Sequence, residues 1–187
     1  MEELLANTNI LRVISYPRIF KPEECEKIIS LDGLKLDSPV YIQDNIEDYK
    51  QESFPQVTDL TLNNNISWIF ERVEKVLLHA NKNFFKFGIR GINVLRVNKY
   101  DENRSFEWHT DIGNEALSIR KLTIVVFLSK KEDYEGGELK WWDLNDKINQ
   151  EQGSVALFPP YMLHCVTPIT KGVRYTLACW AVGHHFK

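Results

Sequence analysis

The stretch RKLTIVVFLS, residues 120–129, decides the fold, because its apolar and β-branched run from Leu122 to Leu128 is typical of a β-strand. Seven strand-like stretches follow residue 88, and turn signals such as YEGGE and EQGS punctuate them. They are INVLRVNKY, FEWHTDI, RKLTIVVFLS, GELKWWDL, SVALFPP, MLHCVTPI and GVRYTLACWAV. No helical pattern of useful length separates them, which disfavours a parallel sheet. The sequence therefore predicts an antiparallel sandwich or jelly roll.

The first part of the chain predicts two helices. Residues 22–31 place a proline and acidic residues in a first turn. Residues 63–82 repeat apolar residues at helical spacing, and the asparagines at 63–65 are available as the N-cap. We expect both helices to pack against one outer face of the sheets, so the fold class is mainly β with flanking helices. Between the helices, residues 44–56 are acidic and predict a surface loop, a candidate for the mouth of a pocket.

The composition of the chain limits the classes of protein to which it can belong. A chain of 187 residues that is 43% hydrophobic, with a net charge of −3, is expected to form one domain over residues 1–187. The longest apolar run is too short to cross a membrane, and the first residues, MEELLANTN, are acidic where a signal peptide is basic. Basic residues form no stripe, and the three cysteines show no paired spacing. We therefore expect a cytoplasmic protein that binds neither a membrane nor nucleic acid.

The segment FEWHTDI contains a candidate metal site. His109 and Asp111 are two positions apart, so on a strand both side chains point to the same face. A hydrogen-bonded His–Asp pair at a strand end is the simpler explanation. However, His164 lies on a later predicted strand, and two histidines with one carboxylate form the facial triad of non-haem Fe(II) oxygenases. Three ligands on one face of an octahedron leave three positions for a chelating cosubstrate and dioxygen.

Arg174 is a candidate for cosubstrate binding. It follows His164 by ten residues, and strand alternation places it on one face with Thr176, Ala178 and Trp180. A cation that faces the inside of a barrel needs an anionic partner, and 2-oxoglutarate offers a carboxylate remote from its metal-chelating end. Thr176 would add a hydroxyl group to that carboxylate. The alternative is that Arg174 pairs with one of the surface acids.

Taken together, these residues resemble the Fe(II)- and 2-oxoglutarate-dependent oxygenases of the prolyl-4-hydroxylase-like group, which includes the bacterial PKHD-type hydroxylases. The resemblance covers about residues 88–182 and rests on HTD, LTIVVFLS, YEGGEL, GSVALFPP and LHCVTPITKGVRYTLACW. It implies a double-stranded β-helix core of the cupin type over residues 88–182, which residues 1–87 support with helices and strands.

The resemblance also implies the roles of the site residues. Iron would be held by His109, Asp111 and His164, which form the catalytic centre. Arg174 would hold the tail carboxylate of 2-oxoglutarate, and Tyr100 would line the cosubstrate pocket. Phe127 stands where some relatives have a tyrosine that reaches the cosubstrate, so that hydrogen bond would be missing here.

The implied activity is hydroxylation of an unactivated C–H bond by O₂ with release of succinate and CO₂, with ascorbate as a candidate reductant. The resemblance favours a prolyl residue in a peptide or protein as the substrate, and a free amino acid or another small molecule is the alternative. A cupin-like module with a redox-silent metal is a further alternative, but such a module needs no buried cation at the site. Nucleic-acid demethylases of the AlkB type usually carry a second arginine six residues after the first, where this chain has Trp180.

Other aromatic and titratable residues have simpler explanations. One of Trp141 and Trp142 should face the core and the other should face outward, since they are adjacent on a predicted strand. Trp180 is expected to line the iron pocket, and Glu107 shares the face of His109 near its mouth. The remaining histidines are interpreted as structural or solvated: His79, His184 and His185.

Overall fold

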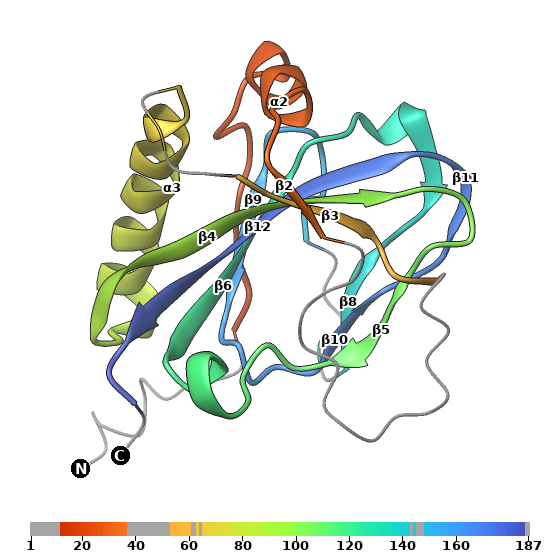
Figure 1. The fold of residues 1–187 in the computed structure, drawn as a ribbon. Coiled ribbons are helices and arrows are strands. Elements are labelled where there is room, and N and C mark those ends of the chain that lie inside the picture. The colour runs from red at the N-terminus through yellow and green to blue at the C-terminus, as the bar shows by residue number, and fades with distance from the viewer. Residues whose placement is uncertain are drawn as a thin grey trace.

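A large antiparallel sheet is the framework of the molecule. The computed structural model describes residues 12–36, 53–60, 63, 65–142, 144 and 148–185. The main sheet has seven strands in the order β1-β9-β6-β12-β4-β3-β2, and all neighbouring strands run antiparallel (Figure 1). Along the chain these strands are β1 (Ile14–Tyr16), β2 (Leu34–Leu36), β3 (Gln56–Leu60), β4 (Ile89–Tyr100), β6 (Arg120–Phe127), β9 (Val155–Phe158) and β12 (Arg174–Gly183).

Two small antiparallel sheets complete the β structure. One has the order β5-β10-β8 and the other pairs β11 with β7. A buried apolar cluster joins the sheets, because Val125 and Phe127 of the main sheet pack in it with Trp141 and Val166 of the small one. This arrangement confirms the predicted double-stranded β-helix. The strands are β5 (Phe106–His109), β7 (Tyr134–Gly136), β8 (Leu139–Trp141), β10 (His164–Val166) and β11 (Ile169–Gly172).

Both predicted helices are present and cover the outer face of the main sheet. They are α2 (Pro22–Ile29) and α3 (Ser67–Ala80), which a π-helical turn (Asn81–Phe85) extends (Figure 1). The predicted asparagine cap is wrong: α3 begins after Ile66, and the Asn63 side chain instead accepts a hydrogen bond from the Asn65 backbone N–H. None of the helices in the described ranges combines the length and the apolar character that crossing a bilayer requires.

Strand alternation divides the interior into two apolar clusters. On β12, Leu177, Cys179 and Ala181 pack toward the helices, together with α3 residues such as Leu77. The intervening β12 residues face the space between the sheets. Because β12 presents one face to the helix-side cluster and the other to the cavity, the helix layer and the cavity share one wall.

The N-terminal strands were not predicted. β1 and β2 have three residues each, which is too short for alternation to stand out. The predicted surface loop at residues 44–56 ends inside β3, which begins at Gln56, and its residues 44–52 lie outside the described part of the chain. Pairing with neighbouring strands, rather than local pattern, creates these edge elements.

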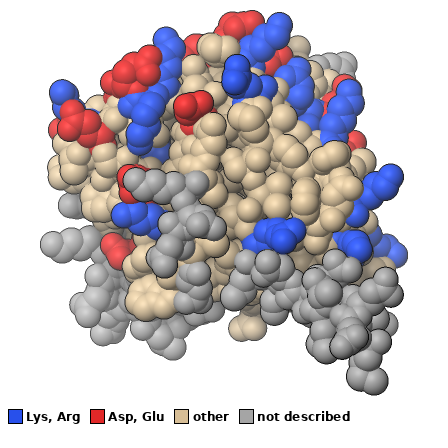
Figure 2. All heavy atoms as spheres, turned by 180° about the vertical axis from the view of Figure 1, so that it is seen from behind, with Lys and Arg blue, Asp and Glu red and all other residues tan. Residues whose placement is uncertain are grey.

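The surface charge is mixed in sign. Seen from behind, acidic and basic side chains intermingle along the upper part of the molecule, and the centre of this face is largely uncharged (Figure 2). Exposed ion pairs, such as Lys140 with Glu138 at 3.1 Å, also join charges of opposite sign on the surface. On this face the described residues therefore create no field of a single sign.

The packing of α3 against the main sheet can be tested with two adjacent leucines of α3. Leu77 is buried with 1% of its surface exposed, whereas Leu78 is 55% exposed. Leu77→Ala should lower the free energy of unfolding by about 2–5 kcal/mol because it leaves a cavity. Leu78→Ala should change it by no more than about 0.5 kcal/mol. Urea denaturation measures both, and equal losses would contradict the described packing.

Candidate metal centre

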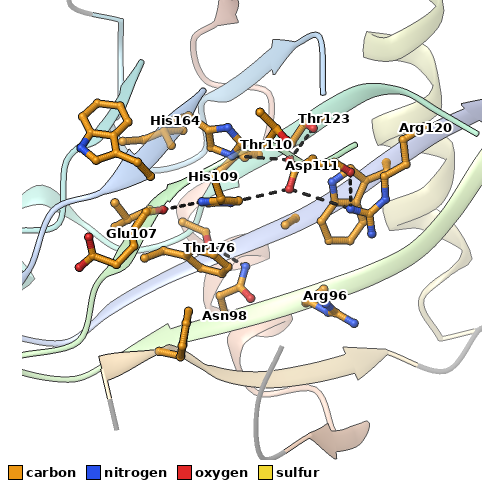
Figure 3. A pocket seen from close by; sticks show the side chains of 18 of the residues that line it. Arg96, Asn98, Glu107, His109, Thr110, Asp111, Arg120, Thr123, His164 and Thr176 are labelled. Carbon is orange, nitrogen blue, oxygen red and sulfur yellow. Dashed lines mark hydrogen bonds and ion pairs between the residues drawn. The ribbon is translucent and has the colours of Figure 1, made fainter. Parts of the chain in front are cut away.

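The predicted site residues meet in one cavity between the main sheet and the β5-β10-β8 sheet. The cavity has a volume of about 310 Å³, and Figure 3 shows the polar residues on its walls. Its lining includes every residue that the sequence suggested as a ligand or cosubstrate contact, namely Tyr100, His109, Asp111, His164, Arg174 and Thr176.

The two histidines face each other across neighbouring strands. His109 of β5 pairs directly with His164 of β10, and their ring centroids are 4.2 Å apart. In His109 the Nδ1 atom lies 2.6 Å from the Glu107 carbonyl oxygen. In His164 the Nδ1 atom lies 2.8 Å from the Met162 carbonyl oxygen. A carbonyl oxygen only accepts, so in the neutral rings Nδ1 carries the proton. The lone pair is then on Nε2 of each ring, where a metal can bind it.

Asp111 joins the histidines from a turn and not from the strand. The sequence analysis placed it on the same strand as His109, but β5 ends at His109. The Asp111 N–H donates to the Pro160 oxygen at 2.7 Å, and its carbonyl accepts from Arg120 Nη1 at 2.9 Å. These bonds hold the turn so that the carboxylate reaches the histidines (Figure 3). Its oxygens lie 3.8 Å from His109 Nε2 and 3.6 Å from His164 Nε2.

The surroundings favour the protonation states that a metal needs. Burial alone would raise the pKa of Asp111, but the charges of His164, His109 and Arg120, with a 2.6 Å hydrogen bond from the Thr123 hydroxyl, hold it below its ordinary value. Burial and the neighbouring His164 lower the pKa of His109 to about 4, against the opposing effect of Asp111. Near neutral pH the carboxylate is therefore ionised and His109 is neutral, as metal binding requires.

These three side chains could hold a metal ion. Their ligand atoms all lie within 4.8 Å of one another, and in the described ranges they are the one group of histidine, cysteine or acidic residues clustered this closely. Two imidazoles and a carboxylate are the donor set of non-haem Fe(II) sites, in which the remaining coordination positions stay open. The hydrogen bonds to both Nδ1 atoms and to Asp111 orient the ligands from behind. The residues present therefore fit Fe(II).

Arg174 provides a cation at the end of the same cavity. Its side chain is only 1% exposed, and its guanidinium group lies 5.2 and 5.8 Å from the ring centroids of Tyr100 and Phe127. None of its three nitrogen atoms has a hydrogen-bond acceptor among the described residues. Burying an unpaired cation costs several kcal/mol. The site is therefore shaped for an anion that this part of the polypeptide does not supply, and a planar carboxylate fits the guanidinium fork.

A glycine makes room for this arginine. Gly137, in the YEGGEL motif, has a φ of +60°, which disfavours other residues. A Cβ atom built there would lie 2.8 Å from Cδ of Arg174 and would also collide with Ile169. The turn between β7 and β8 thus needs glycine both for its backbone conformation and for the close approach of Arg174.

Polar groups continue along the wall from Arg174. Across the main sheet, Arg174 pairs with Tyr100 and Thr176 pairs with Asn98. The Asn98 amide donates to the Thr176 hydroxyl at 3.4 Å (Figure 3). Burial raises the pKa of Tyr100 to about 12, although Arg174 acts in the opposite direction. Its phenol therefore stays protonated near neutral pH and remains a hydrogen-bond donor.

The other residues considered from sequence are placed as expected. Trp141 is buried and Trp142 is 63% exposed, while Trp180 and Glu107 line the cavity. Sequence analysis missed five polar lining residues, whose inward direction becomes visible only in the folded chain: Arg96, Asn98, Thr110, Arg120 and Thr123. Two of the remaining histidines have ordinary contacts, His79 with Tyr16 and His185 with Ser118.

Comparison with known proteins finds relatives of the core. Residues 95–182 match the family model of the 2OG-Fe(II) oxygenase superfamily. A PKHD-type hydroxylase of Synechococcus sp. (strain CC9902) is 34% identical over 94 residues, which are 49% of this chain and 42% of the relative. The PKHD-type hydroxylase YbiX of Escherichia coli O6:K15:H31 is 34% identical over 101 residues, 49% of this chain and 44% of that protein. The chain thus spans less than half the length of these relatives.

Solved structures share the fold at low sequence identity. A prolyl-4-hydroxylase from Pseudomonas putida superposes with a TM-score of 0.67 at 12% identity, covering 98% of both chains. A prolyl hydroxylase from Trichoplax adhaerens, in complex with a hypoxia inducible factor oxygen degradation domain peptide fragment, has a TM-score of 0.66 at 17% identity and covers 96% of this chain and 86% of that one. These likenesses establish the double-stranded β-helix fold.

The low pKa of His109 should make the metal-free protein less stable in mild acid. A histidine in the unfolded chain takes up a proton below about pH 6.5. In the folded protein His109 does so only near pH 4, so the unfolded state binds more protons between these values. The free energy of unfolding therefore falls as the pH is lowered through this window, and His109 should account for about 1–2 kcal/mol between about pH 7 and pH 5.

Urea denaturation of metal-free protein at the two pH values measures this loss. His109→Asn should lose less stability than the wild type between them. His79→Asn, which changes an exposed histidine outside the cavity lining, should lose as much as the wild type. An unchanged pH dependence in His109→Asn would show that His109 is not the group that the fold keeps neutral.

Proposed function

We propose that this protein is an Fe(II)- and 2-oxoglutarate-dependent hydroxylase. His109, Asp111 and His164 would bind the iron, and Arg174 would bind the tail carboxylate of 2-oxoglutarate, with Tyr100 and Thr176 beside it. The observation that carries the proposal is the buried Arg174 guanidinium group, which has no acceptor among the described residues and shares a cavity with the three clustered ligands. A redox-silent metal module has no need for such a cation. The match of residues 95–182 to the 2OG-Fe(II) oxygenase superfamily supports the same conclusion.

Bound Fe(II) with 2-oxoglutarate would supply the oxidation: O₂ converts 2-oxoglutarate to succinate and CO₂, and one oxygen atom is inserted into a substrate C–H bond. The protein residues bind and orient. The hydrogen bonds to Nδ1 of both histidines fix their rings, and Thr123 and Arg120 fix Asp111. Ascorbate is a candidate reductant for iron that oxidises without substrate.

A prolyl residue in a peptide or protein is the substrate that we propose first. The support comes from similarity: two of the structures that share the fold are named as prolyl hydroxylases, one of them in complex with a peptide. Trp108, 38% exposed, lines the cavity and contacts the exposed Trp142, with ring centroids 5.3 Å apart. Exposed indoles of this kind suit contact with a proline ring or a peptide. A free amino acid is the alternative.

We further propose that residues 88–182 form the catalytic core, that residues 1–87 support it, and that the protein works in the cytoplasm. In support, β2 and β3 extend the main sheet, α2 and α3 cover it, and β1 pairs at its other edge. The three cysteines are free and buried, as in proteins of a reducing compartment.

Anaerobic reconstitution tests the proposed activity. Wild-type protein loaded with Fe(II) and 2-oxoglutarate should release succinate and hydroxylated product when O₂ is admitted with panels of prolyl peptides and free amino acids.

The variant Asp111→Ala tests the metal ligands, because it lacks the anionic one. Loss of a residue that only hydrogen-bonds a metal ligand typically lowers metal affinity about 10–100-fold, and the loss in Asp111→Ala should be larger. Its coupled turnover should vanish. Asp101→Ala, outside the cavity lining, is the matched control, and wild-type succinate release by Asp111→Ala would refute the ligand assignment.

Arg174 should control cosubstrate affinity and leave metal affinity unchanged. Loss of one partner of a buried charge pair costs about 3–5 kcal/mol, so Arg174→Ala should weaken 2-oxoglutarate binding by about a hundredfold to a few thousandfold. Arg174→Lys should recover only part of this, because a point charge replaces a planar fork. Anaerobic titration of the Fe(II)-loaded variants, followed by the absorption of the metal chelate, measures the dissociation constant.

The exposed Arg90, on the same sheet, provides the matched control, and Arg90→Ala should bind 2-oxoglutarate as the wild type does. An unchanged dissociation constant in Arg174→Ala would remove the cosubstrate from this end of the cavity. It would also restore the redox-silent metal module as the better explanation of the site.

A further inference from the structure

We propose that Asn98 is a positioning residue for the cosubstrate, because its amide directs the hydroxyl hydrogen of Thr176 toward the tail carboxylate of 2-oxoglutarate. This inference rests on the proposed function, in which Arg174 binds that carboxylate and Thr176 lies beside it. All three side chains line the cavity. They are also buried, with exposed fractions of 8% for Asn98, 3% for Thr176 and 1% for Arg174.

The strand register gives Thr176 one polar neighbour across the main sheet. Thr176 of β12 pairs with Asn98 on β4 and with Phe127 on β6. The ring of Phe127 has no hydrogen-bonding group, so of these two cross-strand neighbours only Asn98 can orient the Thr176 hydroxyl. Arg174 occupies the next inward position of β12, two residues or about 7 Å along the strand. The hydroxyl and the guanidinium group therefore belong to neighbouring positions of one wall.

The direction of the hydrogen bond leaves Thr176 with a hydrogen to donate. The Asn98 amide donates to the Thr176 oxygen at 3.4 Å (Figure 3). A hydroxyl group has one hydrogen and two lone pairs, so the amide occupies a lone pair and the hydrogen points elsewhere. Among the described residues this hydrogen has no acceptor. A buried donor without an acceptor is unfavourable unless a ligand supplies one.

The same wall holds a second set of donors without acceptors. The guanidinium nitrogens of Arg174 also have no partner among the described residues. An ionised carboxylate only accepts and offers about four lone-pair sites, of which a bidentate arginine uses two. The Thr176 hydrogen would use a third. In a chain from amide to hydroxyl to carboxylate each bond polarises the next, so a bound carboxylate would strengthen the long bond between Asn98 and Thr176.

The place of Asn98 in the sheet also needs a reason. Strand β4 lies inside the main sheet, between β12 and β3, and asparagine is disfavoured in strands. An apolar residue would fill this buried position without the cost of desolvating an amide. Residues that break a local rule in this way are expected where they serve a ligand.

A purely structural role for Asn98 makes a different prediction. Its amide would then only link β4 to β12, and its loss would lower stability without acting on the cosubstrate through Thr176. If Asn98 acts through the hydroxyl group, its replacement affects cosubstrate binding only while that hydroxyl is present. The coupling between the two positions therefore separates the two roles.

A double-mutant cycle tests the proposal by binding and does not depend on turnover. The probe is 2-oxoglutarate, titrated without O₂ into Fe(II)-loaded protein and followed by the absorption of the chelate. Thr176→Val removes the hydroxyl and should weaken binding about 10–100-fold, as is typical for a hydrogen bond to a charged group. Asn98→Ala lets the hydroxyl turn away and should weaken binding about two- to tenfold. In the Thr176→Val background, Asn98→Ala should have no further effect.

Asn98→Asp reverses the hydrogen bond at nearly constant size. The new carboxylate only accepts, so the Thr176 hydrogen would turn toward it and away from the cosubstrate. Binding should therefore weaken more than in Asn98→Ala. The same change in the Thr176→Val background measures charge repulsion alone and should cost less affinity than in the wild type. Thr176→Ser retains the hydroxyl and should retain both the affinity and the coupling to Asn98→Ala.

The controls separate this inference from the proposed function. Thr58→Val, on the strand next to β4 and outside the cavity lining, should bind 2-oxoglutarate as the wild type does. Metal affinity and urea denaturation are measured in parallel, and metal affinity should stay unchanged. The inference is overturned if Asn98→Ala changes the affinity equally with and without the Thr176 hydroxyl, or if Thr176→Val binds as the wild type does. Weak binding in Arg174→Ala without this coupling would overturn the inference alone, whereas a wild type that binds no 2-oxoglutarate would overturn the proposed function as well.

Discussion

The pairing of β12 with both β4 and β6 is the constraint on which the rest of the structure depends. Alternation along one strand sends Leu177, Cys179 and Ala181 into the helix-side core and sends Arg174, Thr176 and Trp180 into the cavity. A shift of register by one residue would exchange the two sets. The apolar core therefore fixes the inward direction of the polar residues, and the stability of the fold and the geometry of the site have the same origin.

A second feature of the site is that the described residues do not satisfy all of its charged groups. Buried cations are normally paired, because desolvation is costly. Arg174 nevertheless has no acceptor among the described residues, and three potential metal ligands cluster in the same cavity. A buried cation in this position is unfavourable by itself and would become favourable when an anion binds beside it. The free energy of folding the β-helix thus holds the groups in position for ligands.

Much of the fold and most of the site could be predicted from the sequence. The apolar runs after residue 88 predicted seven of the nine strands there and missed the short β7 and β11, and the helical periodicity of residues 63–82 predicted α3. The His-x-Asp pair, the later histidine and the arginine ten residues further on predicted which residues meet in the cavity. These features are local patterns or fixed spacings, and such patterns persist in the folded chain because each strand must bury one of its faces.

What the sequence by itself determined about this protein is therefore the succession of the main strands after residue 88, the residues on each face of β12 and the types of ligand available for a metal. Only the tertiary structure decided the placement of Asp111 in a turn held by Pro160 and Arg120, and the gathering of Arg96 and Arg120 around Trp180. The physical reason is that these contacts join strands distant in sequence. Their geometry depends on register and on turns closed by long-range hydrogen bonds, which no local periodicity encodes.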